Sequence, residues 1–141
     1  MTADTPEPRF LGDGDGTGGP VPPDGWGAVA CVFWFTSAVD LVRADRVVND
    51  RSNYDIWVPR PVLRVDGRDV PASWSGWWYP LRPGPHQVEV LEPAPAGLRV
   101  QVTAGATDRL RYRARIRIRK DHTDTHILEW RSTATLDPVA D

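Results

Sequence analysis

Arginine occupies every second position of the stretch 109–120, which reads RLRYRARIRIRK. Side chains two apart on an extended chain lie about 7 Å apart on the same side, within the Debye length of about 8 Å at physiological salt. The row therefore repels itself and favours acidic groups beside it. We expect an acidic protein partner to dock on these arginines: Arg109, Arg111, Arg113, Arg115 and Arg117.

Two other interpretations of the arginine row stay open. The row can be a solvated outer face that Glu89, Glu92 and Glu129 on neighbouring strands partly neutralise. It can also bind phosphate groups, which makes a nucleic-acid or anion binder an alternative function. No aromatic residues alternate with the arginines on their own face, and this argues against single-stranded nucleic acid.

Four aromatic residues cluster around Gly76: Trp74, Trp77, Trp78 and Tyr79. In an extended chain Trp74 and Trp78 share one side, which we expect to face the core, and Trp77 and Tyr79 share the other. Outward rings can stack on sugars or fill a partner's pocket. A carbohydrate-binding module that uses Trp77 and Tyr79 is therefore a second candidate function, against the alternative that all four rings pack in the core.

His86 follows a turn at Pro83-Gly84 and is a candidate for acid–base chemistry by residue type alone. No nucleophile or acid lies near it in the sequence, as catalysis would require. We expect His86 to bond a backbone group or to pack.

Two polar stretches contain residue types that bind metal ions. They hold Asp121, His122, Asp124 and His126 in the first, and Asp13 and Asp15 in the second. The first lacks a third His or Cys for a closed site, and the second lacks the terminal bidentate carboxylate of a calcium loop. We expect a solvated hairpin tip and a flexible linker, with no metal and no cofactor.

Motifs of the common catalytic sites are absent from the sequence. There is no G-x-S-x-G, no H-E-x-x-H, no phosphate loop and no dinucleotide fingerprint. We therefore expect no catalytic residues and a protein that is not an enzyme.

The residues between the arginines show which element positions them. They are Leu110, Tyr112, Ala114, Ile116 and Ile118. Strict alternation of this kind predicts a β-strand with one face on a core and one face outward. At about 3.3 Å per residue the strand is roughly 40 Å long, so it needs neighbours along its edges.

Short apolar runs between turn residues predict those neighbours. The expected strands are 28–35, covered on both faces, then 54–58, 62–65, 77–81, 86–91 and 98–102, and a last one in which Leu128, Trp130, Ala134 and Leu136 face inward. The expected turns are 49–53, Asp66-Gly67, Pro83-Gly84 and 121–125. The stretch 37–49 fits a strand or a helix, and its valines favour a strand.

These elements predict an all-β fold: one antiparallel β-sandwich of about seven to nine strands, spanning residues 26–137. Residues 1–25 are rich in Gly and Pro, and we expect a disordered acidic tail. The whole chain has a net charge of -2, and acidic residues outnumber basic ones in this tail. The domain that remains is therefore positive, chiefly along the arginine row.

About half the chain carries a pattern of turns and strands that resembles the PEGA-type small β-sandwich modules of bacterial proteins. The residues that match this pattern are Val65, Asp66, Gly67, Leu81, Pro83, Gly84, His86, Val88, Val90 and Gly105. The resemblance implies a small β-sandwich that is non-catalytic. The tryptophans at 74, 77 and 78 exceed what the pattern requires.

The remaining features concern the compartment. Cys31 is the only cysteine, so no intrachain disulfide can form. The first ten residues lack a signal-peptide pattern, and the apolar stretch 26–39 is shorter than the roughly 20 residues that span a bilayer. We expect a cytoplasmic protein without a membrane span, with export by a signal-less route left open.

The sequence does not specify the oligomeric state. The function we expect is a non-catalytic β-sandwich interaction module.

Overall fold

The computed structural model describes residues 5–12, 19–52 and 58–139, and every regular element in these ranges is a strand. The ten strands are β1 (Arg9–Gly12), β2 (Gly27–Arg43), β3 (Arg46–Ser52), β4 (Val62–Val65), β5 (Arg68–Val70), β6 (Ser75–Leu81), β7 (Gly84–Glu92), β8 (Ala96–Val102), β9 (Thr107–Asp121) and β10 (Ile127–Pro138). The prediction of an all-β chain is confirmed, with more strands than we expected.

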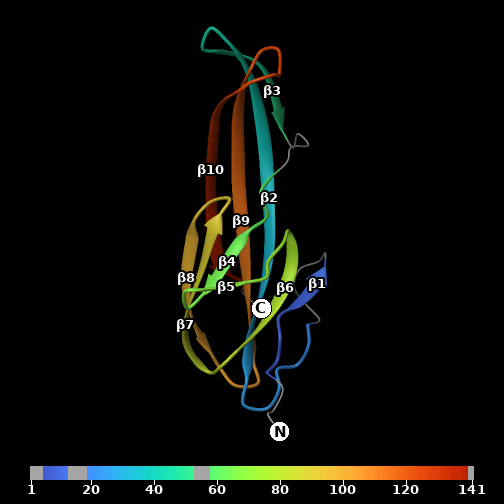
Figure 1. Ribbon diagram of the computed structural model, residues 1–141, viewed down its shortest axis with the longest axis vertical. Coiled ribbons are helices and arrows are strands. Elements are labelled where there is room, and N and C mark those ends of the chain that lie inside the picture. The colour runs from blue at the N-terminus through green and yellow to red at the C-terminus, as the bar shows by residue number, and fades with distance from the viewer. Residues whose placement is uncertain (1–4, 13–18, 53–57, 140–141) are drawn as a thin grey trace.

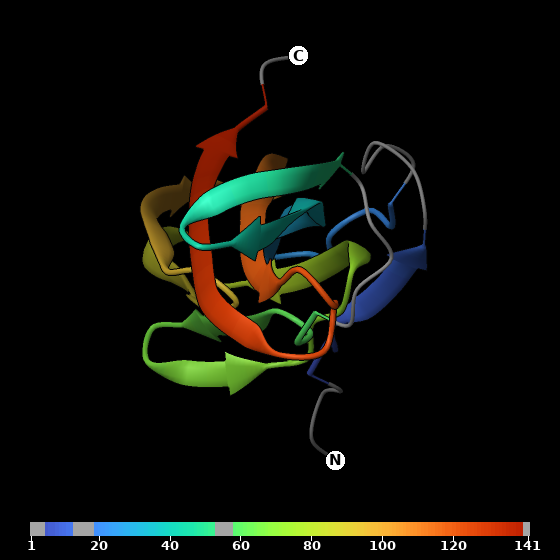
Figure 2. The same ribbon diagram turned by 90° about the horizontal axis from the view of Figure 1, so that it is seen from above.

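The strands form two sheets. The first has the order β1-β6-β2-β9-β10, with β3 also paired to β2, and the second has the order β5-β4-β7-β8. Figure 1 shows β2, β9 and β10 running along the long axis, with the second sheet beside only part of their length. Seen along that axis in Figure 2, the second sheet lies on one side of the long strands.

The two longest strands, β2 and β9, pair in parallel, from Ala28 opposite Thr107 to Val42 opposite Asp121. The prediction of a purely antiparallel fold is wrong for this pair, although the other pairings in both sheets are antiparallel. Parallel neighbours need a long crossover connection. Here the second sheet and β6 lie in that connection, so the sequence between β2 and β9 gives no local sign of the pairing.

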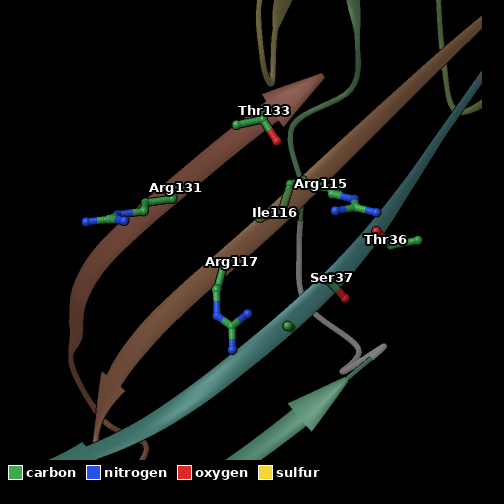
Figure 3. A pocket seen from close by; sticks show the side chains of 8 residues that line it. Thr36, Ser37, Arg115, Ile116, Arg117, Arg131 and Thr133 are labelled. Atoms are coloured by element: carbon green, nitrogen blue, oxygen red, sulfur yellow. The ribbon is translucent and has the colours of Figure 1, made fainter. Parts of the chain in front are cut away.

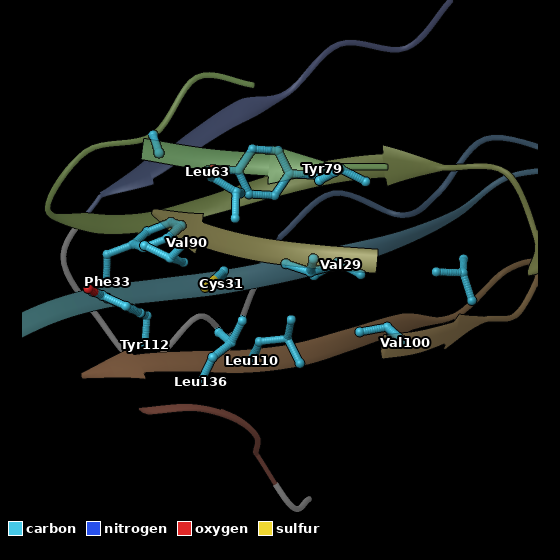
Figure 4. Packing of buried hydrophobic residues seen from close by; sticks show 14 of the residues in the cluster. Val29, Cys31, Phe33, Leu63, Tyr79, Val90, Val100, Leu110, Tyr112 and Leu136 are labelled. Carbon is cyan, nitrogen blue, oxygen red and sulfur yellow. The ribbon is translucent and has the colours of Figure 1, made fainter. Parts of the chain in front are cut away.

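The main core lies between the two sheets. Its largest fully buried members include Phe33 of β2, Leu63 of β4, Val90 of β7 and Tyr112 of β9. Figure 4 shows side chains of both sheets pointing into this common space. The alternation along β9 is confirmed, because each of its apolar residues from Leu110 to Ile118 is buried.

A second, smaller cluster lies further along the long strands. It joins Ile116 and Ile118 of β9 to Val39 and Leu41 of β2, with Val58 over them. Part of the cover on this inner face thus comes from the chain between β3 and β4 instead of from the second sheet.

Tyr112 ties the two sheets together through a buried hydroxyl. Its Oη donates to the carbonyl of Ala94 at 2.8 Å and accepts from the N–H of Ala94 at 3.2 Å, in the connection between β7 and β8. Ser132 of β10 donates to the carbonyl of Pro93 beside it, at 2.9 Å. Burial raises the pKa of Tyr112 to about 12, so the phenol stays neutral at physiological pH.

The stretch 37–49 is extended, which confirms the strand interpretation, but its turn lies at Ala44 and Asp45. These residues have φ values of 51° and 61°, as a two-residue type I′ hairpin requires. The predicted turn at 49–53 is wrong for residues 49–52, which belong to β3. Ala-Asp lacks the Asn-Gly signature that marks such turns. Residue 53 and most of the predicted strand 54–58 lie outside the described residues.

The other predicted turns are confirmed in part. Asp66 and Gly67 have φ values of 52° and 81° and join β4 to β5 as a hairpin. Gly84 has the expected positive φ, at 127°, but it is already the first residue of β7 and pairs with Val102 of β8. The Pro83-Gly84 turn, however, links β6 of the first sheet to β7 of the second. At this point the chain therefore crosses from the first sheet to the second.

The prediction of a disordered tail over residues 1–25 is wrong for Arg9–Gly12. This segment is strand β1, and it pairs with β6 so that Phe10 lies opposite Trp77. Leu11 packs on an outer-face cluster made by Ala28, Ala30 and Trp78. The cluster is apolar, and covering it stabilises a segment that has little other reason to fold.

In the last strand, the predicted inward residues divide into two groups. Leu136 is buried and Ala134 packs on the main core. Leu128 is 59% exposed because the register shifts between Ile127 and Glu129. Trp130 lies opposite Ile118 but is 38% exposed. The prediction is therefore wrong for Leu128 and only partly right for Trp130.

The buried and exposed faces of β9 lead to a first prediction. Ile116→Asp should cost more than about 3 kcal/mol of folding free energy, because it buries an unpaired carboxylate. Arg115→Asp on the opposite face should cost less than about 1 kcal/mol. Urea unfolding of both variants measures the difference, and equal damage would contradict the assignment of faces.

The N-terminal strand leads to a second prediction. Leu11→Ser should lower the free energy of unfolding by about 1 kcal/mol, because it uncovers part of the Trp78 cluster. Val21→Ser is the matched control, since Val21 is 84% exposed, and should change stability by less than about 0.5 kcal/mol. If both variants unfold at the same urea concentration as the unaltered chain, β1 contributes nothing to the fold.

Candidate anion-binding face

The outer face of the first sheet carries the arginines of β9 between two rows of neighbours from β2 and β10. We call this surface the Arg face. Its members, level by level along the strands, are Trp34, Arg113 and Thr135, then Thr36, Arg115 and Thr133, then Ala38, Arg117 and Arg131, then Asp40, Arg119 and Glu129. The parallel register with β2 thus decides which side chain stands beside each arginine.

Arg117 is held by a buried carboxylate of β2. Its Nε and one terminal nitrogen donate to the two carboxylate oxygens of Asp40 at 2.8 and 3.0 Å, and the Asp40 side chain is only 2% exposed. Asp50 of β3 adds a second carboxylate at 3.5 Å. The hydrogen bonds from Arg117 hold the pKa of Asp40 below its ordinary value. Arg117 is therefore neutralised within the protein.

Arg119 and Arg131 share the carboxylate of Glu129. The Arg119 contact is 3.9 Å, and Arg131 donates to the other carboxylate oxygen. Of the three glutamates expected to relieve the arginine row, Glu129 is confirmed. The expectation is wrong for Glu89 and Glu92, because both lie on β7 in the second sheet.

Arg113 and Arg115 differ from these neighbours. Both are exposed, and neither forms an ion pair or a side-chain hydrogen bond with the part of the chain that the structure describes. Arg111 is half-buried and lies opposite Asp137, while Arg109 is half-buried and is not free. Arg111 likewise forms no ion pair among the described residues, so the unpaired charge of the row lies on Arg111, Arg113 and Arg115, of which the last two are exposed.

A shallow cavity of about 440 Å³ opens beside Arg115. Its polar lining includes Thr36 of β2, Thr133 of β10 and the arginines 115, 117 and 131, and the small side chain of Ala38 leaves room in its floor. Figure 3 shows Arg115 reaching toward Thr36, while Arg131 extends away from β9. These hydroxyl and guanidinium groups can all donate hydrogen bonds. Arg117 and Arg131 already bond carboxylates, and Ile116 and Ala38 add apolar surface, so an oxyanion in the cavity would meet chiefly Arg115 and the two threonine hydroxyls.

Trp34 adds an aromatic surface to the Arg face. It lies opposite Arg113, is 57% exposed, and stacks against Phe35 with ring centroids 5.9 Å apart. Among the described pairings, β6 leaves β2 at Phe33 and β3 joins it at Ala38, so neither strand reaches Trp34. No aromatic residue alternates with the arginines within β9 on their face, as expected, but the neighbouring strand β2 places Trp34 beside them.

The aromatic cluster around Gly76 follows the expectation for Trp74, which packs on the main core, and reverses it for the other three rings. Tyr79 is 2% exposed, faces the main core and donates to the carbonyl of Pro71 at 2.7 Å. Trp77 is half-buried beside it and donates to Ser73 at 2.8 Å. Tyr79 pairs with Val29, whose side chain faces the core. Trp78 faces outward instead, under Leu11.

His86 fulfils the expectation of a backbone bond and adds an acidic partner. Its Nε2 lies 2.6 Å from the carbonyl oxygen of Arg82, and its Nδ1 lies 2.6 Å from a carboxylate oxygen of Asp66. Both neighbours are acceptors, so the contacts require protons on both ring nitrogens. Partial burial opposes the charge, but the hydrogen bonds to Arg82 and Asp66 outweigh it and raise the pKa of His86.

The polar turn after β9 is organised around Asp121. Its carboxylate accepts bonds from the backbone N–H groups of Thr125 and His126 and from the hydroxyls of Thr123 and Thr125. These hydrogen bonds, the Thr123 hydroxyl first, lower the pKa of Asp121. Among the described residues no three His, Cys, Asp or Glu side chains are grouped to hold a metal ion. The carboxylate is occupied in shaping the turn.

Comparison of the chain with protein-family models, curated proteins and solved structures found no match. The resemblance to PEGA-type modules therefore stays a prediction. No helix in the described ranges is long and apolar enough to cross a membrane.

The contacts of His86 lead to a third prediction, a pH dependence of stability. Because its pKa is raised above the ordinary value of 6.5, its contribution is fully present below pH 6.5 and is lost as the pH rises through the folded-state value. Urea unfolding between pH 6 and 9 should show this loss in the unaltered chain. The control is His86→Gln, which should lack it; the same slope in both proteins would contradict the charged state of His86.

Proposed function

We propose that the chain is a non-catalytic β-sandwich module that binds an acidic segment of a protein partner on its Arg face. The observation that carries this proposal is the pair of exposed arginines, Arg113 and Arg115, that lack an acidic partner in the described part of the protein. The sandwich architecture is supported by the core that both sheets share.

The chemistry of the cavity favours a carboxylate. Guanidinium groups bind planar oxyanions through paired, charge-assisted hydrogen bonds. Thr36 and Thr133 stand on either side of Arg115 at the same level of the sheet, so two hydroxyl groups lie beside the guanidinium. An acidic side chain placed there gains donors on several sides and relieves the repulsion within the arginine row.

Acidic residues within the Arg face favour a protein over a nucleic acid. Asp40, Asp50 and Glu129 neutralise the arginines at one end, and Asp137 lies opposite Arg111 near the other. A polynucleotide needs a continuous positive track along its phosphates. The interrupted charge suits a short acidic segment better. The carbohydrate alternative loses support, since Tyr79 is buried and Trp77 is half-buried.

Binding of dye-labelled poly-glutamate, followed by fluorescence anisotropy, gives a fourth prediction. Replacing both free arginines, Arg113→Ser with Arg115→Ser, should weaken binding at least tenfold, about 1.4 kcal/mol, and flatten its dependence on salt. The matched control is Arg68→Ser with Arg99→Ser, which removes the same charge from exposed positions of the second sheet. It should bind like the unaltered chain.

Two results of this experiment would contradict the proposal. Equal losses in the two double variants would show a general charge effect without a site. Tighter binding of a single-stranded oligonucleotide than of poly-glutamate, lost in the Arg113/Arg115 variant, would assign the face to nucleic acid instead.

A further inference from the structure

Exposing the large apolar side chain of Trp34 to water is unfavourable for the free energy of folding. Contacts with neighbouring rings hold it in a defined position on the Arg face. One side of its ring is backed by Phe35, which in turn packs against Trp74 with centroids 4.7 Å apart. Trp74 continues the contact to Tyr112 of the main core. The exposed indole is thus supported from behind by a chain of rings that ends in the core. A supported ring can serve as a platform for a flat or apolar ligand group.

The cavity beside Arg115 lies one side-chain repeat further along the same strands. Trp34 and Thr36 are two apart on β2, and they lie opposite Arg113 and Arg115 of β9. The two levels are therefore about 7 Å apart. A partner chain in an extended conformation places its residues i and i+2 at the same spacing on one side. A helix brings residues three or four apart to a similar distance, so a separation of two residues in the partner's sequence is the sign of an extended segment.

We propose that the partner segment is extended and carries an aromatic side chain two residues from an acidic one. The aromatic ring lies on Trp34, and the acidic group enters the cavity between Thr36, Arg115 and Thr133. This inference rests on the proposed function and adds to it a spacing and an aromatic anchor. The proposed function uses charge alone, and charge alone favours neither a particular spacing nor an aromatic residue in the partner.

The test uses three dye-labelled peptides with the same flanking residues and the full chain. Their central sequences are Phe-Ser-Glu-Ser-Glu, Ser-Phe-Glu-Ser-Glu and Ala-Ser-Glu-Ser-Glu. The first two have the same composition and charge, but only the first places the ring two residues from an acid. We expect the first peptide to bind at least fivefold more tightly than each of the others in fluorescence anisotropy.

Variants of Trp34 test whether the tighter binding of the first peptide depends on the exposed Trp34 ring. Trp34→Ala should bind all three peptides with the affinity that the unaltered chain shows for the alanine peptide, and Trp34→Phe should keep the preference. Thermal unfolding of both variants checks that they remain folded. Equal binding of the three peptides to the unaltered chain, or a preference that survives in Trp34→Ala, would overturn the inference.

The same data separate this inference from the function on which it rests. If the peptides bind equally and the binding depends on Arg113 and Arg115, the spacing rule fails and the acidic-partner function stands. If the Arg113→Ser, Arg115→Ser variant binds every peptide as the unaltered chain does, the proposed function fails as well. Tighter, Trp34-dependent binding of a thymidine oligonucleotide would overturn the protein partner in favour of nucleic acid.

Discussion

The parallel pairing of β2 with β9 determines both the core and the candidate site. Because side chains alternate along a strand, one register sends Val29, Cys31 and Phe33 into the main core together with Leu110 and Tyr112. The same register sets the partners of the arginines on the outer face. A slip of one residue would exchange the two faces of β2 and place the Asp40 carboxylate among apolar side chains. The register that buries the apolar side chains of β2 and β9 therefore also determines which polar side chains lie beside each arginine.

Asp40 shows how the fold accommodates a dense row of like charges. The Asp40 carboxylate is only 2% exposed, which is unfavourable for a charged group without partners, and the paired bonds from Arg117 supply them. Asp50 and Glu129 extend the relief to the end of the row where β3 and β10 lie beside β2 and β9. In the part of the chain that the structure describes, no ion pair or side-chain hydrogen bond relieves Arg113 or Arg115. Local neutralisation thus leaves a defined basic spot instead of a uniformly positive face.

Features that depend on local pattern could be predicted from the sequence. The alternation in β9 identified its buried residues and the outward face of its arginines, and Asp66-Gly67 identified a hairpin. The bond of His86 to a backbone carbonyl also agrees with the expectation. In each case the information lies within a few residues, where periodicity and turn chemistry act.

Features that depend on distant pairing could not be predicted in this way. Asp40 and Arg117 are far apart in the sequence, and only the parallel register brings them together. Trp34 lies between the last described pairing of β6 with β2, at Phe33, and the first described pairing of β3, at Ala38, and no local pattern records this gap. The orientation of Tyr79 depends on its pairing with Val29, and β1 forms because Leu11 covers Trp78. A long-range partner decides each of these outcomes.

The central claim is that Trp34 forms one binding surface with Arg113 and Arg115, which have no acidic partner among the described residues. The most direct measurement is a ¹H–¹⁵N NMR titration of the full chain with poly-glutamate, which maps every perturbed site at once. We expect the largest shifts at the Arg113 and Arg115 side chains, the Trp34 indole, and the Thr36 and Thr133 backbone. Shifts centred on the second sheet, or spread evenly over all exposed arginines, would contradict the account.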